Sequence, residues 1–195
     1  MLRDKIIQRC ADAELGTLVI LSDVPSFGIR PKEIKNGLAI PPKLSLRNLM
    51  QIAGSPRWAI ETLLAGQPEF KTLLPYIPKG LSLSHLGLFM NQIFSGRMNE
   101  ERVKVIRDKW KGNLVLKGVA SEEDTEAAIR MGVDGVIVSN HGGRQLNAGQ
   151  STIKPLQQIS EKYKNKIKIM MDSGIRTGPD IASSLASGAE FTFLG

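Results

Sequence analysis

Short apolar runs recur along the chain, and helical periodicity separates most of them. Five runs have the length and apolar content of buried parallel strands, at residues 17–21, 113–117, 135–139, 168–171 and 191–194. Amphipathic patterns predict helices at residues 6–15 (ended by Gly16), 99–110, 121–132, 155–163 and 177–188. Strands and helices that alternate in this way predict an α/β fold with a parallel sheet and helical crossovers.

Polar or flexible residues follow the predicted strands at their carboxyl ends. They are Asp23, Lys117, Ser139, Asp172 and Gly195. Their placement on one side favours a (β/α)8 TIM barrel over a doubly wound sheet, which has a single switch point. Five strands cannot close such a barrel, so we expect an incomplete barrel over residues 1–195 that carries strands 4 to 8 and is cut at both ends.

Residues 26–96 interrupt this rhythm and predict a long loop excursion after strand 4. Eight prolines between residues 25 and 78 divide it into short pieces. The clearest helix follows Ser55-Pro56 and contains the apolar residues Trp58, Ile60, Leu63 and Leu64. Apolar residues here could cover an active site, pack on a neighbouring subunit, contact a membrane surface or pack on the parent domain.

Composition narrows the class of protein. The chain is 42% hydrophobic and 23% charged, which is typical of a soluble globular protein. The net charge is +7, but the basic residues are scattered, so we expect no nucleic-acid partner. No membrane span or leader is expected, and the single Cys10 excludes an internal disulfide and fits a reducing cytoplasm. No His, Cys and carboxylate cluster has metal-ligand spacing, so no metal site is predicted.

The turn after the strand at 135–139 carries the clearest candidate chemistry. His141 can exchange a proton near neutral pH, and Arg144 can hold a carboxylate through two parallel hydrogen bonds. Gly142-Gly143 allows positive φ and a close approach of the backbone to a ligand. Asp23, on another strand end, could accept the second N–H of the imidazole. A structural histidine without a catalytic role is the alternative.

Two further strand ends suit anions. Lys117 ends a buried strand. Burying its ammonium group is costly unless an anion or an electron-rich ring contacts it. The alternative is a lysine whose ammonium group reaches solvent at the barrel rim. Residues 172–178 place Asp172, a flexible turn and Arg176 before a helix N-terminus, an arrangement that suits a phosphate. A surface ion pair of Arg176 is the alternative.

Several motifs together resemble the FMN-dependent α-hydroxy acid dehydrogenases and oxidases, the enzymes that oxidise lactate, glycolate and mandelate. They cover nearly the whole chain: Ser22-Asp23-Val24-Pro25, Asn36-Gly37, Leu116-Lys117-Gly118, Ser139-Asn140-His141-Gly142-Gly143-Arg144-Gln145 and Asp172-Ser173-Gly174-Ile175-Arg176. The resemblance implies FMN as cofactor and oxidation of a small L-2-hydroxy acid to the 2-oxo acid.

The resemblance also implies catalytic roles. His141 resembles the base that removes a substrate proton as two electrons pass to the flavin, and Asp23 the carboxylate that stabilises the imidazolium. Arg144 and Arg30 resemble the pair that holds the substrate carboxylate. Lys117 resembles the lysine beside the flavin N1–C2 edge. The other implied flavin contacts are Ser139, Asp172, Ser173, Gly174, Ile175, Arg176 and Gly195.

The chain also departs from the family pattern. Leu21 stands where a threonine is usual, Ile29 where arginine is frequent, and the arginine expected after Gly195 is absent. The first three barrel strands are missing, so we expect the C-terminal portion of such an enzyme, inactive by itself, with a non-catalytic fragment or pseudoenzyme as the alternative.

The resemblance leaves the setting of the enzyme open. The electron acceptor could be dioxygen, a quinone or a cytochrome. A homo-oligomer (a tetramer), a cytoplasmic location and peripheral contact of residues 43–95 with the inner membrane face are further expectations.

Overall fold

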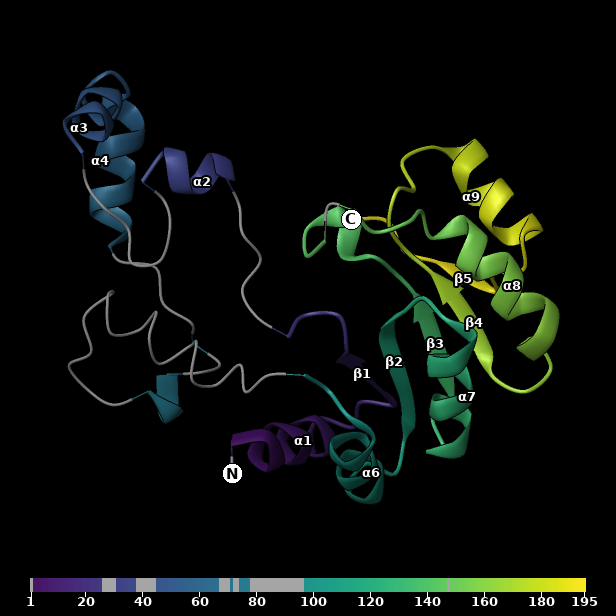
Figure 1. Cartoon of the computed structure of the whole chain (residues 1–195). Helices are drawn as coiled ribbons and strands as arrows, with labels where there is room; N and C mark the ends of the chain where they lie inside the picture. Colours follow the sequence, from purple (N-terminus) through teal and green to yellow (C-terminus); the bar gives the residue numbers. More distant parts are fainter. Residues whose placement is uncertain are drawn as a thin grey trace. The chain divides into compact units, whose positions relative to one another are not determined.

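The computed structural model describes residues 2–25, 31–37, 45–66, 71, 74–77, 97–146 and 148–195. The chain divides into two compact units, one formed by residues 1–28 and 96–195 and the other by residues 29–95. Figure 1 labels the helices and strands of both units, which are described here one at a time.

A five-stranded parallel sheet forms the centre of the first unit. The strands follow one another in chain order: β1 Thr17–Leu21, β2 Asn113–Val119, β3 Gly135–Val138, β4 Lys168–Met171 and β5 Phe191–Thr192. Each strand is an apolar run whose N–H and C=O groups bond to its neighbours. All five carboxyl ends therefore meet at one edge of the sheet, as the sequence predicts.

Helices alternate with the strands along the chain and cover one face of the sheet (Figure 1). They are α1 Leu2–Asp12, α6 Glu100–Lys109, α7 Glu122–Arg130, α8 Ile153–Tyr163 and α9 Gly178–Ala186. Side-chain oxygens of Asn99, Ser121 and Thr177 accept a backbone N–H in the first turns of α6, α7 and α9. These caps fix where three of the helices begin.

The core lies between the sheet and these helices. Alternate strand residues point into it, among them Leu114 and Leu116 of β2 and Val136 and Val138 of β3. On the opposite face, Val115 and Ile137 are also buried. Because side chains alternate along a strand, Lys117 and Ser139 lie on this second face, two residues beyond Val115 and Ile137.

An ion pair fastens the amino-terminal edge of the sheet. Arg107 Nη1 lies 2.7 Å from Asp134 Oδ2, which also accepts the backbone N–H of Leu114 at 2.7 Å. Arg107 Nη2 donates to the carbonyls of Trp110 and Gly112. These bonds join the end of α6 to the starts of β2 and β3.

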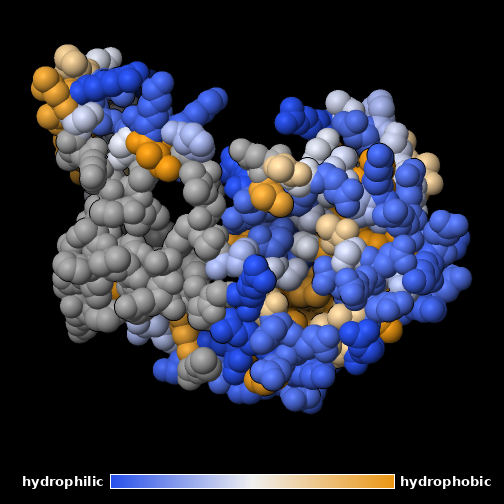
Figure 2. Space-filling model, viewed as in Figure 1, coloured by the Kyte–Doolittle hydropathy of each residue, from blue (hydrophilic) through white to orange (hydrophobic). Residues whose placement is uncertain are grey.

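The second unit is helical in the residues described. It contains α2 Pro31–Lys35, α3 Leu46–Ala53, α4 Pro56–Ala65 and the 3-10 turn η1 Leu74–Tyr76. Large apolar side chains of α3 and α4 are exposed, with Leu63 at 81% and Leu64 at 83%, and some are visible in Figure 2. Among the described residues, no helix has the length and apolar character needed to cross a membrane.

Several predicted boundaries and orientations are wrong. The first helix ends at Asp12, and Glu14 rather than Gly16 takes the left-handed conformation after it, with φ 54°. The second strand continues to Val119, while the last ends at Thr192. The helical spacing of Ile181 and Leu185 predicts that both face inward, but Leu185 is 45% exposed. Such errors of a few residues arise because side-chain caps and local bonds set the ends of elements.

Candidate active site

Three polar side chains from neighbouring strands meet at the carboxyl edge of the sheet. Lys117 Nζ lies 2.6 Å from Asp172 Oδ2 and donates to Ser139 Oγ at 2.7 Å. Ser139 is almost fully buried, and the side chains of Lys117 and Asp172 are each 19% exposed. The buried ammonium group of Lys117 is therefore paired with an anion, and that anion is the carboxylate of Asp172 in the same chain.

The carboxyl group of Asp172 is held in its charged form. Burial alone would raise its pKa, but hydrogen bonds from Lys117, Ser139 and Ser173 outweigh this and lower the pKa below its ordinary value of 3.8. Asp172 is therefore a carboxylate at neutral pH and can accept hydrogen bonds.

The turn after β3 is left-handed over three consecutive residues. His141, Gly142 and Gly143 have φ of 57°, 64° and 72° and form the short turn η2 His141–Gly143. The backbone N–H of His141 donates to Ser139 Oγ at 3.1 Å, and that of Gly143 donates to the Asn140 side chain at 3.2 Å. A non-glycine residue in this conformation is strained, so these bonds hold the imidazole in a set position.

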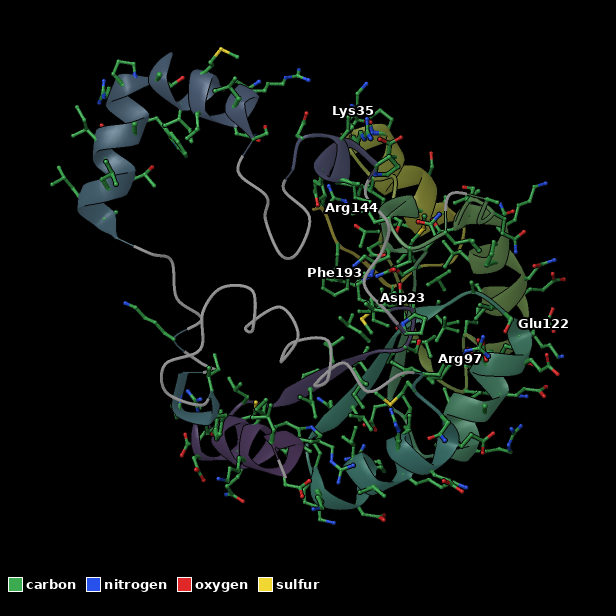
Figure 3. All side chains as sticks on the ribbon, turned by 60° about the vertical axis from the view of Figure 1, so that its left-hand side comes forward. Asp23, Lys35, Arg97, Glu122, Arg144 and Phe193 are labelled. Atoms are coloured by element: carbon green, nitrogen blue, oxygen red, sulfur yellow. The ribbon has the colours of Figure 1, made fainter. Side chains whose placement is uncertain are left out.

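His141 faces a carboxylate from a distant part of the chain. Its Nδ1 lies 3.3 Å from both carboxylate oxygens of Asp23, whose side chain is 13% exposed. Figure 3 labels Asp23 together with Arg144 and Phe193. A carboxylate at Nδ1 can orient the ring and stabilise its protonated form, while Nε2 remains the atom suited to proton transfer.

Ser22 and Gly118 hold Asp23 in place, although neither was predicted from the sequence to have a role in the site. Ser22 donates its backbone N–H and its hydroxyl to the carbonyl of Lys117, both at 2.8 Å. Gly118 has φ 98°, and a Cβ at this position would lie 2.5 Å from Cβ and Cγ of Asp23. The Lys117-Gly118 pair at a strand end was the available signal for this close approach.

The remaining predicted substrate and terminal residues are less enclosed. Arg144 is exposed and donates its backbone N–H to the carbonyl of His141 at 3.2 Å. Arg30 lies outside the described residues. Gly195 is exposed, three residues after β5.

The turn before α9 can accommodate a phosphate, but some of the backbone N–H groups expected to bind it are already occupied. Gly174 has φ 77°, and a Cβ there or at Gly178 would meet no atom within 4 Å, so a ligand can approach the backbone. Arg176 is exposed, whereas Ile175 packs into the core and can offer a ligand its backbone alone. Asp180 Oδ2 accepts the backbone N–H groups of Arg176 and Thr177, at 3.1 and 2.9 Å.

That carboxylate occupies part of the helix N-terminus. A bound phosphate would therefore depend on the Arg176 guanidinium and the backbone around Gly174. With the Lys117 cation, the Ser139 hydroxyl and the Asp172 carboxylate nearby on the neighbouring strand ends, the donor and acceptor set fits a flavin mononucleotide.

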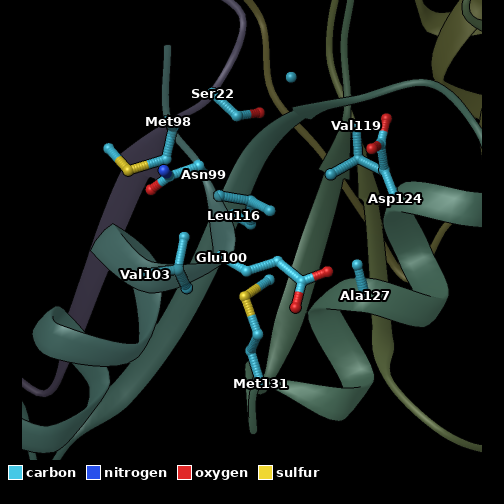
Figure 4. Close-up of a pocket in the computed structure, with 11 residues that line it drawn as sticks. Ser22, Met98, Asn99, Glu100, Val103, Leu116, Val119, Asp124, Ala127 and Met131 are labelled. Atoms are coloured by element: carbon cyan, nitrogen blue, oxygen red, sulfur yellow. The ribbon is translucent and has the colours of Figure 1, made fainter.

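A cavity of about 370 Å³ lies elsewhere in the first unit. Figure 4 shows it between α6 and α7, with Val103, Leu116, Ala127 and Met131 among its lining residues. Ser22 and Gly118 also line it, but His141, Lys117 and Asp172 do not. The cavity is thus on the helix-covered face and separate from the histidine turn.

Comparison with known proteins shows which family the chain resembles. A family model described as FMN-dependent dehydrogenase matches residues 1–195. The chain is 37% identical over 191 residues to an L-lactate dehydrogenase of Vibrio parahaemolyticus, which covers 97% of this chain and 50% of that protein. It is 33% identical to a putative L-lactate dehydrogenase of Mycobacterium tuberculosis over 97% of this chain and 44% of that protein.

Solved structures give the same picture. The fold matches the crystal structure of a monotopic membrane protein, (S)-mandelate dehydrogenase, with a TM-score of 0.85 and 32% identity over 98% of this chain and 50% of that one. A mandelate oxidase variant with (S)-mandelic acid matches with a TM-score of 0.69 and 25% identity over 100% and 45% of the two chains. The chain spans about half the length of the curated relatives it matches.

Proposed function

Because this chain belongs to the family of FMN-dependent dehydrogenases, we propose that it serves the oxidation of a small L-2-hydroxy acid, such as L-lactate, to the 2-oxo acid. The observation that carries the proposal is the His141–Asp23 pair, which lies at the same sheet edge as the Lys117–Asp172 ion pair. A base with its carboxylate partner beside a fixed cation suits removal of a proton while negative charge develops nearby.

In this proposal His141 takes the proton of the substrate hydroxyl, and Asp23 stabilises the imidazolium that results. Arg144, together with Arg30, holds the substrate carboxylate. The α-hydrogen and the two electrons that the substrate loses would pass to FMN when it is bound. Lys117 places positive charge where the reduced cofactor becomes anionic.

The same edge would hold the cofactor. The residues proposed to contact it are Lys117, Ser139, Asp172, Ser173, Gly174, Ile175 (through its backbone), Arg176 and Gly195. Support comes from the buried hydroxyl of Ser139, the ionised carboxylate of Asp172 and the open space at Gly174.

The five strands are proposed to be strands 4 to 8 of a (β/α)8 barrel, with residues 26–96 as an excursion after strand 4. Relatives about twice as long support this proposal, as do two sheet edges whose apolar side chains are exposed, Val19 at 46% and Phe191 at 56%. In a closed barrel both edges pair with further strands.

The wider setting is proposed on the same basis. Residues 43–95 make peripheral contact with the inner face of a membrane from the cytoplasm, an idea supported by the exposed apolar side chains of α3 and α4. The assembled enzyme is a homo-oligomer, a tetramer, and passes its electrons to dioxygen, a quinone or a cytochrome.

Anaerobic bleaching tests the function. The complete protein, which carries this chain together with the first three barrel strands, is titrated with FMN, and the absorbance of the bound flavin is followed after L-lactate or D-lactate is added. We expect bleaching with the L-isomer, and the His141→Gln variant should bind FMN but bleach at least ~100-fold more slowly. Bound FMN that L-2-hydroxy acids fail to bleach would refute the proposal in favour of a non-catalytic FMN-binding protein.

A further inference from the structure

Ser173 has a backbone conformation that its side chain does not favour. Its φ is 75°, and within the described part of the chain Glu14 and His141 are the other non-glycine residues with positive φ. Glycine adopts this conformation without strain. Serine at this position therefore calls for a compensating contact.

The hydroxyl of Ser173 provides such contacts, besides lying 3.5 Å from Ser139 Oγ. Ser173 Oγ donates to Asp172 Oδ1 at 3.0 Å and accepts the backbone N–H groups of Gly142 at 3.0 Å and Asn140 at 3.3 Å. Because its hydrogen points to a carboxylate, its lone pairs are directed to the two N–H donors. One hydroxyl thus joins the end of β4 to both neighbours of His141.

The backbone of Ser173 is held as well. Its carbonyl accepts the hydroxyl of Thr152, at 3.4 Å, from the residue that precedes α8. Asp172, in turn, is fixed by Lys117. The backbone of Ser173 is therefore fixed, and its hydroxyl forms hydrogen bonds that hold the turn carrying His141.

We propose that Ser173 is a positioning residue, whose hydroxyl binds the backbone of Asn140 and Gly142, holds the left-handed turn at residues 141–143 and so places His141 against Asp23. The inference concerns the arrangement of the turn, and its catalytic consequence rests on the proposed function. This role belongs to the hydroxyl of Ser173 and is separate from any contact that the backbone of Ser173 makes with a cofactor.

Two substitutions separate the hydroxyl from the backbone conformation. Ser173→Gly removes both the strain and the hydroxyl, while Ser173→Ala removes the hydroxyl and keeps the strain. Glu14→Gly is the matched control, because it relieves the same kind of strain at the end of α1, away from the site.

Amide hydrogen exchange of the chain without FMN or substrate is the decisive measurement. The Gly142 amide should exchange about tenfold faster in both Ser173 variants, as expected for loss of one hydrogen bond, and at the unchanged rate in Glu14→Gly. Thermal unfolding should show Ser173→Gly at least as stable as Ser173→Ala. Unchanged exchange at Gly142 in both Ser173 variants would overturn the proposal.

Turnover supplies the second readout. In the flavin-loaded complete protein, Ser173→Gly should lower kcat for the hydroxy acid about tenfold with little change in KM, because a displaced base affects the chemical step more than binding. If the unaltered protein fails to bleach, the proposed function fails while the exchange result still decides the role of Ser173. Altered exchange with an unchanged kcat would overturn the positioning of His141.

Discussion

Gly118→Ala tests how the chain places Asp23 against His141. The φ of Gly118 is 98°, and an added Cβ would lie 2.5 Å from Cβ and Cγ of Asp23 and 2.9 Å from its backbone nitrogen. Atoms at such distances must move apart, and one of the three is backbone. The substitution therefore strains its own conformation and pushes Asp23 from its place at the end of β1.

The two costs can be estimated separately. A non-glycine residue held at an unfavourable positive φ costs about 1–3 kcal/mol, and overpacking costs about 1–3 kcal/mol more. Together they predict a loss of roughly 2–6 kcal/mol, against a total of about 5–15 kcal/mol for a typical domain. The variant should still fold, but with a visibly lower stability.

Gly132→Ala is the matched control. Gly132 also has a positive φ, 72°, but its added Cβ would have its nearest contact at 3.9 Å, with Cδ of Arg107. This variant carries the backbone strain without the collision, so it should lose only the strain contribution of about 1–3 kcal/mol. Urea unfolding followed by circular dichroism measures both variants.

Imidazole NMR signals of His141 report the second consequence. They should change in Gly118→Ala, because Asp23 moves relative to Nδ1, and should stay unchanged in Gly132→Ala. Equal stabilities of the two variants, with unaltered His141 signals in both, would refute the role assigned to Gly118.

The remaining predictions concern two ion pairs. The pKa of Asp172 is lowered in the folded chain, so the stability it contributes is present above its unfolded value of 3.8 and is lost as the pH falls through the lower folded value. Lys117→Met removes the hydrogen bond and the charge that lower this pKa, while burial still raises it, so in urea titrations the loss of stability at acid pH should become smaller. An unchanged pH profile would contradict the pairing. Asp134→Ala leaves Arg107 and the N–H of Leu114 without their shared acceptor and should cost about 1–3 kcal/mol in urea unfolding, while leaving flavin bleaching nearly unchanged.

Much of the fold was predictable because its signals are local. Apolar runs identify strands, and the caps Ser121 and Thr177 mark where α7 and α9 begin. The pairing of Asp23 with His141, 118 residues apart, was also predictable, since parallel strands place their carboxyl ends at one edge.

Other features depend on contacts that no pattern encodes. The capping box of α9 directs Asp180 to the N–H groups that a phosphate was expected to use. Lys117 pairs with Asp172, which the sequence pattern assigned to the phosphate-binding turn. The left-handed Glu14 depends on the bond from its N–H to the carbonyl of Ala11, formed only once the helix end is in place.

The position of Asp23 on β1 has a consequence for the whole site. In the described residues β1 pairs with β2 alone, so Asp23 is held from one side, through the bonds of Ser22 to the carbonyl of Lys117. Lys117, Ser139 and Asp172 lie on inner strands with a neighbour on each side. Edge strands open more readily than inner ones. A strand that pairs with the outer edge of β1 would therefore restrain Asp23 most, and with it the histidine pair, while the Lys117–Asp172 pair is already in place.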